Sequence, residues 1–94
     1  MQIIVGMAWY ERDDYPRILE IMEDAEKLPR TYDEWKQRAE LGESQMRAAG
    51  RRVVRAIIKP EEFVAWCATN GHNVDTNGRT AFASAEAASN ARTQ

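Results

Sequence analysis

The chain has 94 residues, of which 44% are hydrophobic and 30% charged, and its net charge is −2. A chain of this length builds a single core, and its hydrophobic content excludes an intrinsically disordered protein. The nearly neutral charge excludes a generally basic nucleic-acid binder, and the single cysteine, Cys67, excludes an intrachain disulfide and a cysteine-based metal cluster.

Residues 1–8 begin with a short apolar run, Ile3-Ile4-Val5, which is followed by Gly6. This composition is typical of a strand and also of an extended arm that packs on a neighbour. Glycine weakens a regular strand, so the sequence leaves both interpretations open. The run is too short for the apolar region of a signal peptide, and no positive residue precedes it. We therefore expect a cytoplasmic protein that makes no contact with a membrane.

Two helices are predicted in the first half of the chain. The sequence Asp13-Asp14-Tyr15-Pro16 favours a helix start, because an acidic residue can cap the first turn and proline is tolerated there. An amphipathic helix is then expected to extend to Leu28. The segment from Thr31 to Glu34 is a capping box that begins a second helix, and Gly50 is suited to its left-handed C-terminal cap.

The run from Gly50 to Pro60 is the only unambiguously strand-like segment, because β-branched residues dominate it. Both of its faces carry apolar side chains: Val54, Ala56 and Ile58 on one, and Val53 and Ile57 with Arg55 on the other. A strand with two apolar faces usually lies within a sheet or beneath covering helices.

Two further helices are predicted after this strand. The third begins at Pro60 and stops at Asn70-Gly71, where positive φ is accepted easily. Its buried face is expected to contain Phe63, Val64, Trp66 and Cys67. The fourth is alanine-rich, extends from Arg79 to Ser89 and follows a cap at Asp75 or Thr76; its anchor is Phe82, with Ala81, Ala85 and Ala88 beside it. Residues 90–94 are expected to fray.

These elements define a small single α+β domain over residues 1–94, in the order (β)-α-α-β-α-α, with a short sheet of one or two strands covered by helices. A lone strand cannot leave its backbone groups unpaired. Residues 53–58 must therefore pair with the N-terminal run, with the same strand of a symmetry mate, or with both, which would give a four-stranded sheet across a dimer. We predict a homodimer.

The charge is unevenly distributed, and this asymmetry suggests a candidate anion or partner site. Residues 1–45 carry 11 acidic and 6 basic residues, whereas residues 46–94 carry 4 and 7. The four arginines of the basic segment match phosphate or carboxylate geometry: Arg47, Arg51, Arg52 and Arg55. The alternative interpretation is that acidic helices and basic strand offset one another within the fold or across the dimer. No established nucleic-acid-binding or nucleotide-binding motif accompanies the arginines.

Cys67, with Trp66 beside it and His72 five residues further on, forms a candidate cleft. A reactive thiol needs a stabilised thiolate, and a position late in a helix disfavours the anion, so core packing is the alternative role of Cys67. A zinc site needs about four ligands, and the sequence near His72 does not contain that many. We therefore predict no catalytic residue, no metal and no cofactor.

Two segments of the sequence resemble a group of short bacterial hypothetical proteins. The segments are the aromatic and capping pattern from Trp9 to Trp35 and the sequence from Pro60 to Cys67. The resemblance implies a compact bacterial protein, and it transfers no activity and no site residue.

The sequence therefore predicts a non-enzymatic, homo-oligomeric binding or adaptor protein, and its candidate partners include another protein. Two alternatives stay open: a nucleic-acid or acidic-partner module that uses the arginine cluster, and a small enzyme that uses Cys67 and His72.

Overall fold

The computed structural model describes residues 2–92. Within them, two strands and four α-helices follow one another in the predicted order: β1 (Ile4–Trp9), α1 (Tyr15–Ile21), α2 (Tyr32–Ala48), β2 (Arg52–Ile57), α3 (Pro60–Asn70) and α4 (Thr76–Arg92). Two single turns of 3-10 helix, η1 (Arg12–Asp14) and η2 (Ala25–Lys27), flank α1. The chain is a small α+β domain, as its sequence indicates.

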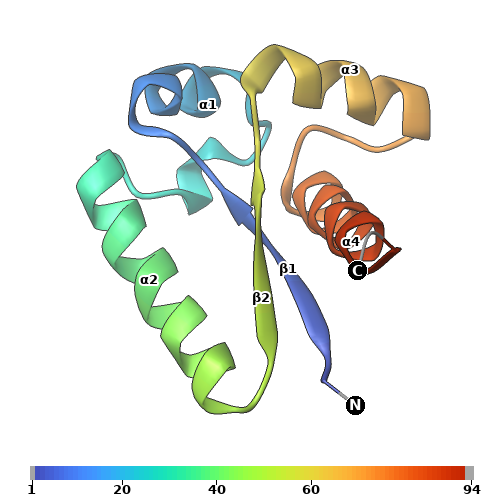
Figure 1. Cartoon of the computed structure of the whole chain (residues 1–94). Coiled ribbons are helices and arrows are strands. Elements are labelled where there is room, and N and C mark those ends of the chain that lie inside the picture. The colour runs from blue at the N-terminus through green and yellow to red at the C-terminus, as the bar shows by residue number, and fades with distance from the viewer. Residues whose placement is uncertain (1, 93–94) are drawn as a thin grey trace.

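The N-terminal run is a strand of the chain's own sheet. β1 and β2 pair in parallel, with Ile4 opposite Arg52 and Trp9 opposite Ile57. A parallel pair needs a long crossover connection, which α1 and α2 supply. The two strands therefore begin at the same end of the sheet and end together below α1 and α3 (Figure 1).

The sheet lies between α2 on one side and α4 on the other (Figure 1). On the α4 side, a Cβ atom added to Gly6 would lie 1.9 Å from the carbonyl oxygen of Ala83, so the α4 backbone rests directly on β1. On the α2 side, the side chain of Met7 reaches Gly42: a Cβ atom added to Gly42 would lie 3.5 Å from the Met7 Cε. Small residues therefore allow close approach on both faces, which is how a sheet of two strands acquires two covering layers.

An aromatic cluster forms the core at the carboxyl end of β1. The ring of Trp35 lies 5.1 Å from that of Trp9 and 4.8 Å from that of Tyr10. Tyr32 donates a hydrogen bond to the Tyr10 carbonyl oxygen at 3.1 Å, and Tyr15 donates one to the Pro29 carbonyl oxygen at 2.5 Å. Burial raises the pKa of Tyr10 to about 12, so its ring stays neutral.

The first helix is shorter than its sequence predicts. The prediction extended it to Leu28, whereas α1 ends at Ile21. Met22 adopts an extended conformation, and the N–H of Glu23 donates to the Val74 carbonyl oxygen at 2.8 Å. Asp24, which would have been a surface residue of the continued helix, is buried against Arg79 instead. Contacts with a distant segment thus override the local helical pattern.

Asp24 and Arg79 form a buried ion pair that joins the segment after α1 to the first turns of α4. The guanidinium donates to both carboxylate oxygens, at 2.8 and 3.2 Å. The N–H and hydroxyl of Thr76 donate to the same carboxylate, at 3.0 and 2.5 Å. These bonds, the Arg79 guanidinium foremost, hold the pKa of Asp24 far below its usual range.

The predicted start of α2 is confirmed. Thr31 is the N-cap, and its Oγ1 accepts a hydrogen bond from the N–H of Glu34 at 3.2 Å. At the other end, Gly50 has φ = +83°, as its suggested capping role requires.

Replacing the cap, Thr31→Ala, should lower the free energy of unfolding by about 1 kcal/mol, because it orphans one N-terminal N–H group. Chemical denaturation measures the loss. Thr69→Ala, on an exposed face of α3, is the matched control and should change stability less. Equal losses in the two variants would contradict the capping role.

The two later helices are present as predicted, but the side chains that they bury differ from the prediction. α3 ends before Gly71 at φ = +72°, as predicted, but Val64 lies 38% exposed instead of buried. α4 begins at Thr76, and Asp75 Oδ1 accepts a hydrogen bond from the N–H of Gly78.

The face that α4 turns to the sheet carries Arg79, Ala83 and Ala87, whereas Ala85 and Ala88 are exposed. The contact with Gly6 selects this stripe, since the alanine pattern alone offers several. The helix continues to Arg92 and so includes three of the five residues expected to fray; the other two lie outside the described residues.

Candidate functional site: a pocket at the carboxyl ends of the strands

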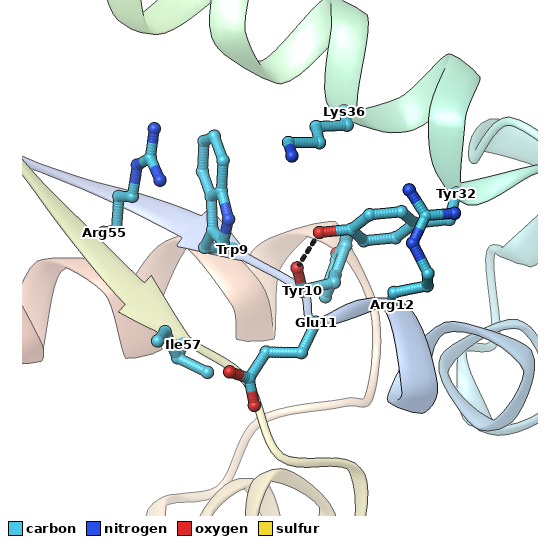
Figure 2. A pocket seen from close by; sticks show the side chains of 8 residues that line it. All are labelled: Trp9, Tyr10, Glu11, Arg12, Tyr32, Lys36, Arg55 and Ile57. Carbon is cyan, nitrogen blue, oxygen red and sulfur yellow. Dashed lines mark hydrogen bonds between the residues drawn. The ribbon is translucent and has the colours of Figure 1, made fainter.

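A pocket of about 360 Å³ opens where the two parallel strands end (Figure 2). Trp9 is the last residue of β1 and Ile57 the last residue of β2. The crevice outside the carboxyl ends of parallel strands is where open α/β sheets bind ligands. We call it the aromatic–basic pocket after its lining: Trp9, Tyr10, Glu11, Arg12, Tyr32, Lys36, Arg55 and Ile57.

Arg55 forms one wall and is held rigidly. Its guanidinium carbon lies 3.8 Å from the centre of the Trp9 ring, within cation–π range. It also donates two hydrogen bonds to Glu43, Nε to Oε2 at 2.7 Å and Nη2 to Oε1 at 2.8 Å. Glu43 is buried on α2, and the bonded guanidinium lowers the pKa of its carboxyl. Arg55 therefore presents a fixed planar cation whose best donors are already engaged.

Arg12 stands at the opposite wall. Its guanidinium lies 4.7 Å from the centre of the Tyr32 ring, and it pairs with Asp33 at 2.7 Å. Both side chains of this pair are more than 60% exposed. Exposed ion pairs contribute little free energy, so Arg12 can exchange Asp33 for another anion at small cost.

Lys36 is the cation of the pocket that is free to bind. Among the described residues, none forms an ion pair or hydrogen bond with its ammonium group. It follows Tyr32 by one helical turn on α2, and Figure 2 shows its side chain extending toward Trp9. The acid of the lining, Glu11, does not neutralise it, because Glu11 pairs with Lys59.

The lining of the pocket is mainly basic and aromatic. Its lining contains three cations, three aromatic rings and one carboxylate, and no cysteine, serine, threonine or histidine belongs to it. Guanidinium and ammonium groups bind carboxylates and phosphates, and the rings offer stacking surfaces for planar groups. The arrangement therefore suits an acidic group, alone or attached to a planar one.

The predicted arginine cluster is divided by the fold. Arg47 joins Arg55 at Glu43, with a separation of 3.4 Å from Oε2. Arg52 faces the other side of the sheet, where it donates to Asn90 Oδ1 at 3.4 Å. Arg51 is exposed between α2 and β2. Of the four arginines, Arg55 alone lines the aromatic–basic pocket.

The predicted cleft of Trp66, Cys67 and His72 lies on and just after α3. Trp66 and His72 stack with centroids 5.5 Å apart and ring planes 4° apart. Cys67 is 1% exposed, and burial raises the pKa of its thiol. Its sulfur lies under Gly78, where an added Cβ would be 3.1 Å away. A thiol packed in this way is not poised for attack on a substrate.

Trp66 instead lines a second pocket, of about 510 Å³. We call it the α3–α4 pocket because most of its lining comes from these helices: Glu62 and Trp66 from α3, Phe82 and Glu86 from α4, and Arg55 and Ile57 from β2.

The sequence does not mark Trp9, Tyr32 and Lys36 as members of one site. The spacing of Tyr32 and Lys36 places them on one helix face, which is a readable signal. Tyr32 and Lys36 lie close to Trp9 only because β1 pairs with β2, and the sequence left that pairing open.

Comparisons with protein-family models, with curated proteins and with solved structures found no match to this chain. Within residues 2–92, no group of three or more histidine, cysteine or acidic side chains is placed to hold a metal ion. In the same part of the chain, no helix has the length and apolar character that crossing a membrane requires.

Proposed function

We propose that this protein is a non-enzymatic binding or adaptor protein whose aromatic–basic pocket receives an acidic group of a ligand or partner. The observation that carries the proposal is the ammonium group of Lys36, which has no hydrogen-bond or ion-pair partner within residues 2–92. It lies in a pocket with two further cations and one carboxylate that is paired with Lys59. An anion that enters the pocket can accept a charge-assisted hydrogen bond from this ammonium group.

The other lining residues have separate roles in this proposal. Arg55, fixed by Glu43, contributes positive potential and a stacking plane rather than new donors. Arg12 contributes donors once it leaves Asp33. Trp9 and Tyr32 provide the walls against which a planar group attached to the anion can pack.

The split arginine cluster favours a discrete acidic group over a nucleic-acid backbone. Binding a phosphate backbone requires cations aligned along one surface. Here Arg52 faces α4 whereas Arg55 faces α2, so the arginines do not form a continuous track.

The test uses phenyl phosphate, which combines a dianion with an aromatic ring, and follows its binding by amide chemical shifts. Lys36→Ala should weaken binding roughly tenfold, because it removes a charge-assisted hydrogen bond. Lys27→Ala is the matched control, since Lys27 is exposed in η2 and lines none of the pockets described above. Equal affinities of the two variants for phenyl phosphate would refute the proposal.

Homodimer formation and a cytoplasmic location also stay predictions. The single cysteine supports a reducing compartment. Light scattering after size exclusion, over a wide concentration range, measures the oligomeric state.

A further inference from the structure

In the part of the chain that the structure describes, β2 has a neighbouring strand on one side only, so its outer edge presents backbone groups that no strand pairs. The N–H of Arg52 donates to the Ile3 carbonyl oxygen, and the N–H of Ile58 donates to the Trp9 carbonyl oxygen. In a parallel ladder such bonds recur at every second residue. The N–H and C=O groups of Val53, Arg55 and Ile57 therefore point away from β1, along the free edge.

This edge lies between the two pockets. Arg55 and Ile57 line the aromatic–basic pocket and also the α3–α4 pocket. Ile57 is 46% exposed, and Arg55 is exposed on the same face of β2. A free edge with a pocket on either side is the geometry in which a sheet accepts an added strand, because successive side chains of a strand point to opposite faces.

We propose that an extended segment of an acidic protein partner adds to the free edge of β2 as a third strand. Its backbone pairs with Val53, Arg55 and Ile57, and alternate side chains enter the aromatic–basic pocket and the α3–α4 pocket. The proposal rests on the proposed function, since it assigns the acidic group of the partner to the same pocket.

Charge selects the occupant. The aromatic–basic pocket, with Lys36 free, takes the acidic side chains of the segment. The α3–α4 pocket has Trp66 and Phe82 rings 5.3 Å apart, and carboxylates of Glu62 and Glu86. It therefore favours an apolar side chain and opposes an acidic one.

A second copy of this chain fits the edge less well than an acidic segment. The segment from Arg47 to Lys59 has five basic residues and no acidic one, so pairing β2 with another β2 brings like charges together. An acidic segment gains from the same charges.

The test compares three eight-residue peptides in which glutamate and valine alternate: the parent peptide, one N-methylated at every glutamate, and one N-methylated at every valine. All three have the same charge. Only one set of alternate N–H groups can face β2, so one methylated peptide should bind like the parent and the other should lose at least about tenfold in affinity. The tolerated set identifies the direction of the added strand.

Amide hydrogen exchange supplies the second measurement. The parent peptide should slow exchange at Val53, Arg55 and Ile57. It should leave unchanged the amide of Gly71, which donates to the Cys67 carbonyl oxygen at the C-terminal end of α3. No binding of the parent peptide, equal binding of both methylated peptides, or unchanged exchange at the three β2 amides would overturn the proposal.

Two further outcomes separate this proposal from the one it rests on. If phenyl phosphate binds through Lys36 while the peptides show no dependence on the methylated set, the edge is not used and the pocket proposal stands. If light scattering finds a dimer in which the three β2 amides are already protected, a second copy occupies the edge and the acidic-partner proposal fails.

Discussion

Arg79→Met is expected to lower the free energy of unfolding by about 3–5 kcal/mol, because it leaves the buried carboxylate of Asp24 without its counter-ion. The Asp24 side chain is 10% exposed, so water cannot replace the two hydrogen bonds that the guanidinium donates. The same change leaves only the Thr76 donors to hold Asp24, and with it the segment after α1, to the start of α4. Urea denaturation measures the loss as a shift of the transition midpoint.

Two further variants separate the ion pair from the volume of the side chain. The double variant Asp24→Asn/Arg79→Met should lose less than the two single variants together, because it removes both charges while the amide oxygen still accepts from the Thr76 N–H. Arg17→Met removes an arginine from an exposed pair with Glu61, and its stability should change little. Additive losses at Asp24 and Arg79 would show that the pair is not coupled.

The same pair gives the domain a defined dependence on acid. The Arg79 guanidinium lowers the pKa of Asp24 in the folded chain, so the folded state binds the proton more weakly than the unfolded state. The stabilisation is complete above the unfolded pKa of about 4 and is lost as the pH falls through the folded value. Between pH 7 and pH 3, wild type should therefore lose more stability than Asp24→Asn. Parallel losses would contradict this assignment.

Features that depend on neighbouring residues were predicted from the sequence, and features that depend on distant ones were not. The cap at Thr31 and the stop at Gly71 are properties of a few adjacent residues, and the structure contains both. The early end of α1 is caused by a carboxylate that pairs with Arg79, 55 positions further along the chain. No local periodicity records that contact.

The candidate site shows the same division. Arg55 could be selected from the sequence because it lies in a basic run. The structure shows that Glu43 and Trp9 hold its guanidinium, so its best donors are not available to a ligand. The sequence places Lys36 on one helix face with Tyr32, but it does not show that Trp9 lies beside them. Lys36 became notable because the parallel register places Trp9 and Ile57 at one end of the sheet, beside the helix that carries it.

Trp35→Ala is expected to cost about 3–5 kcal/mol, which approaches the whole stability of so small a domain. Trp35 is 7% exposed and lies at the centre of the aromatic cluster, in contact with Trp9, Tyr10, Tyr15 and Tyr32. Its removal opens a cavity behind the two aromatic walls of the aromatic–basic pocket, so binding of phenyl phosphate should weaken even in conditions where the variant stays folded.

Far-UV circular dichroism during urea denaturation measures this loss without relying on tryptophan fluorescence, which the substitution itself alters. Trp66→Ala is the matched control: Trp66 is half-buried and stacks on the exposed ring of His72, so its removal leaves a smaller cavity and a smaller loss. The two variants make the same chemical change, one at a buried tryptophan and one at a half-buried tryptophan. A loss at Trp35 no larger than at Trp66 would mean that the aromatic cluster does not hold α2 against the sheet, and the walls of the pocket would then lack the rigid support that binding requires.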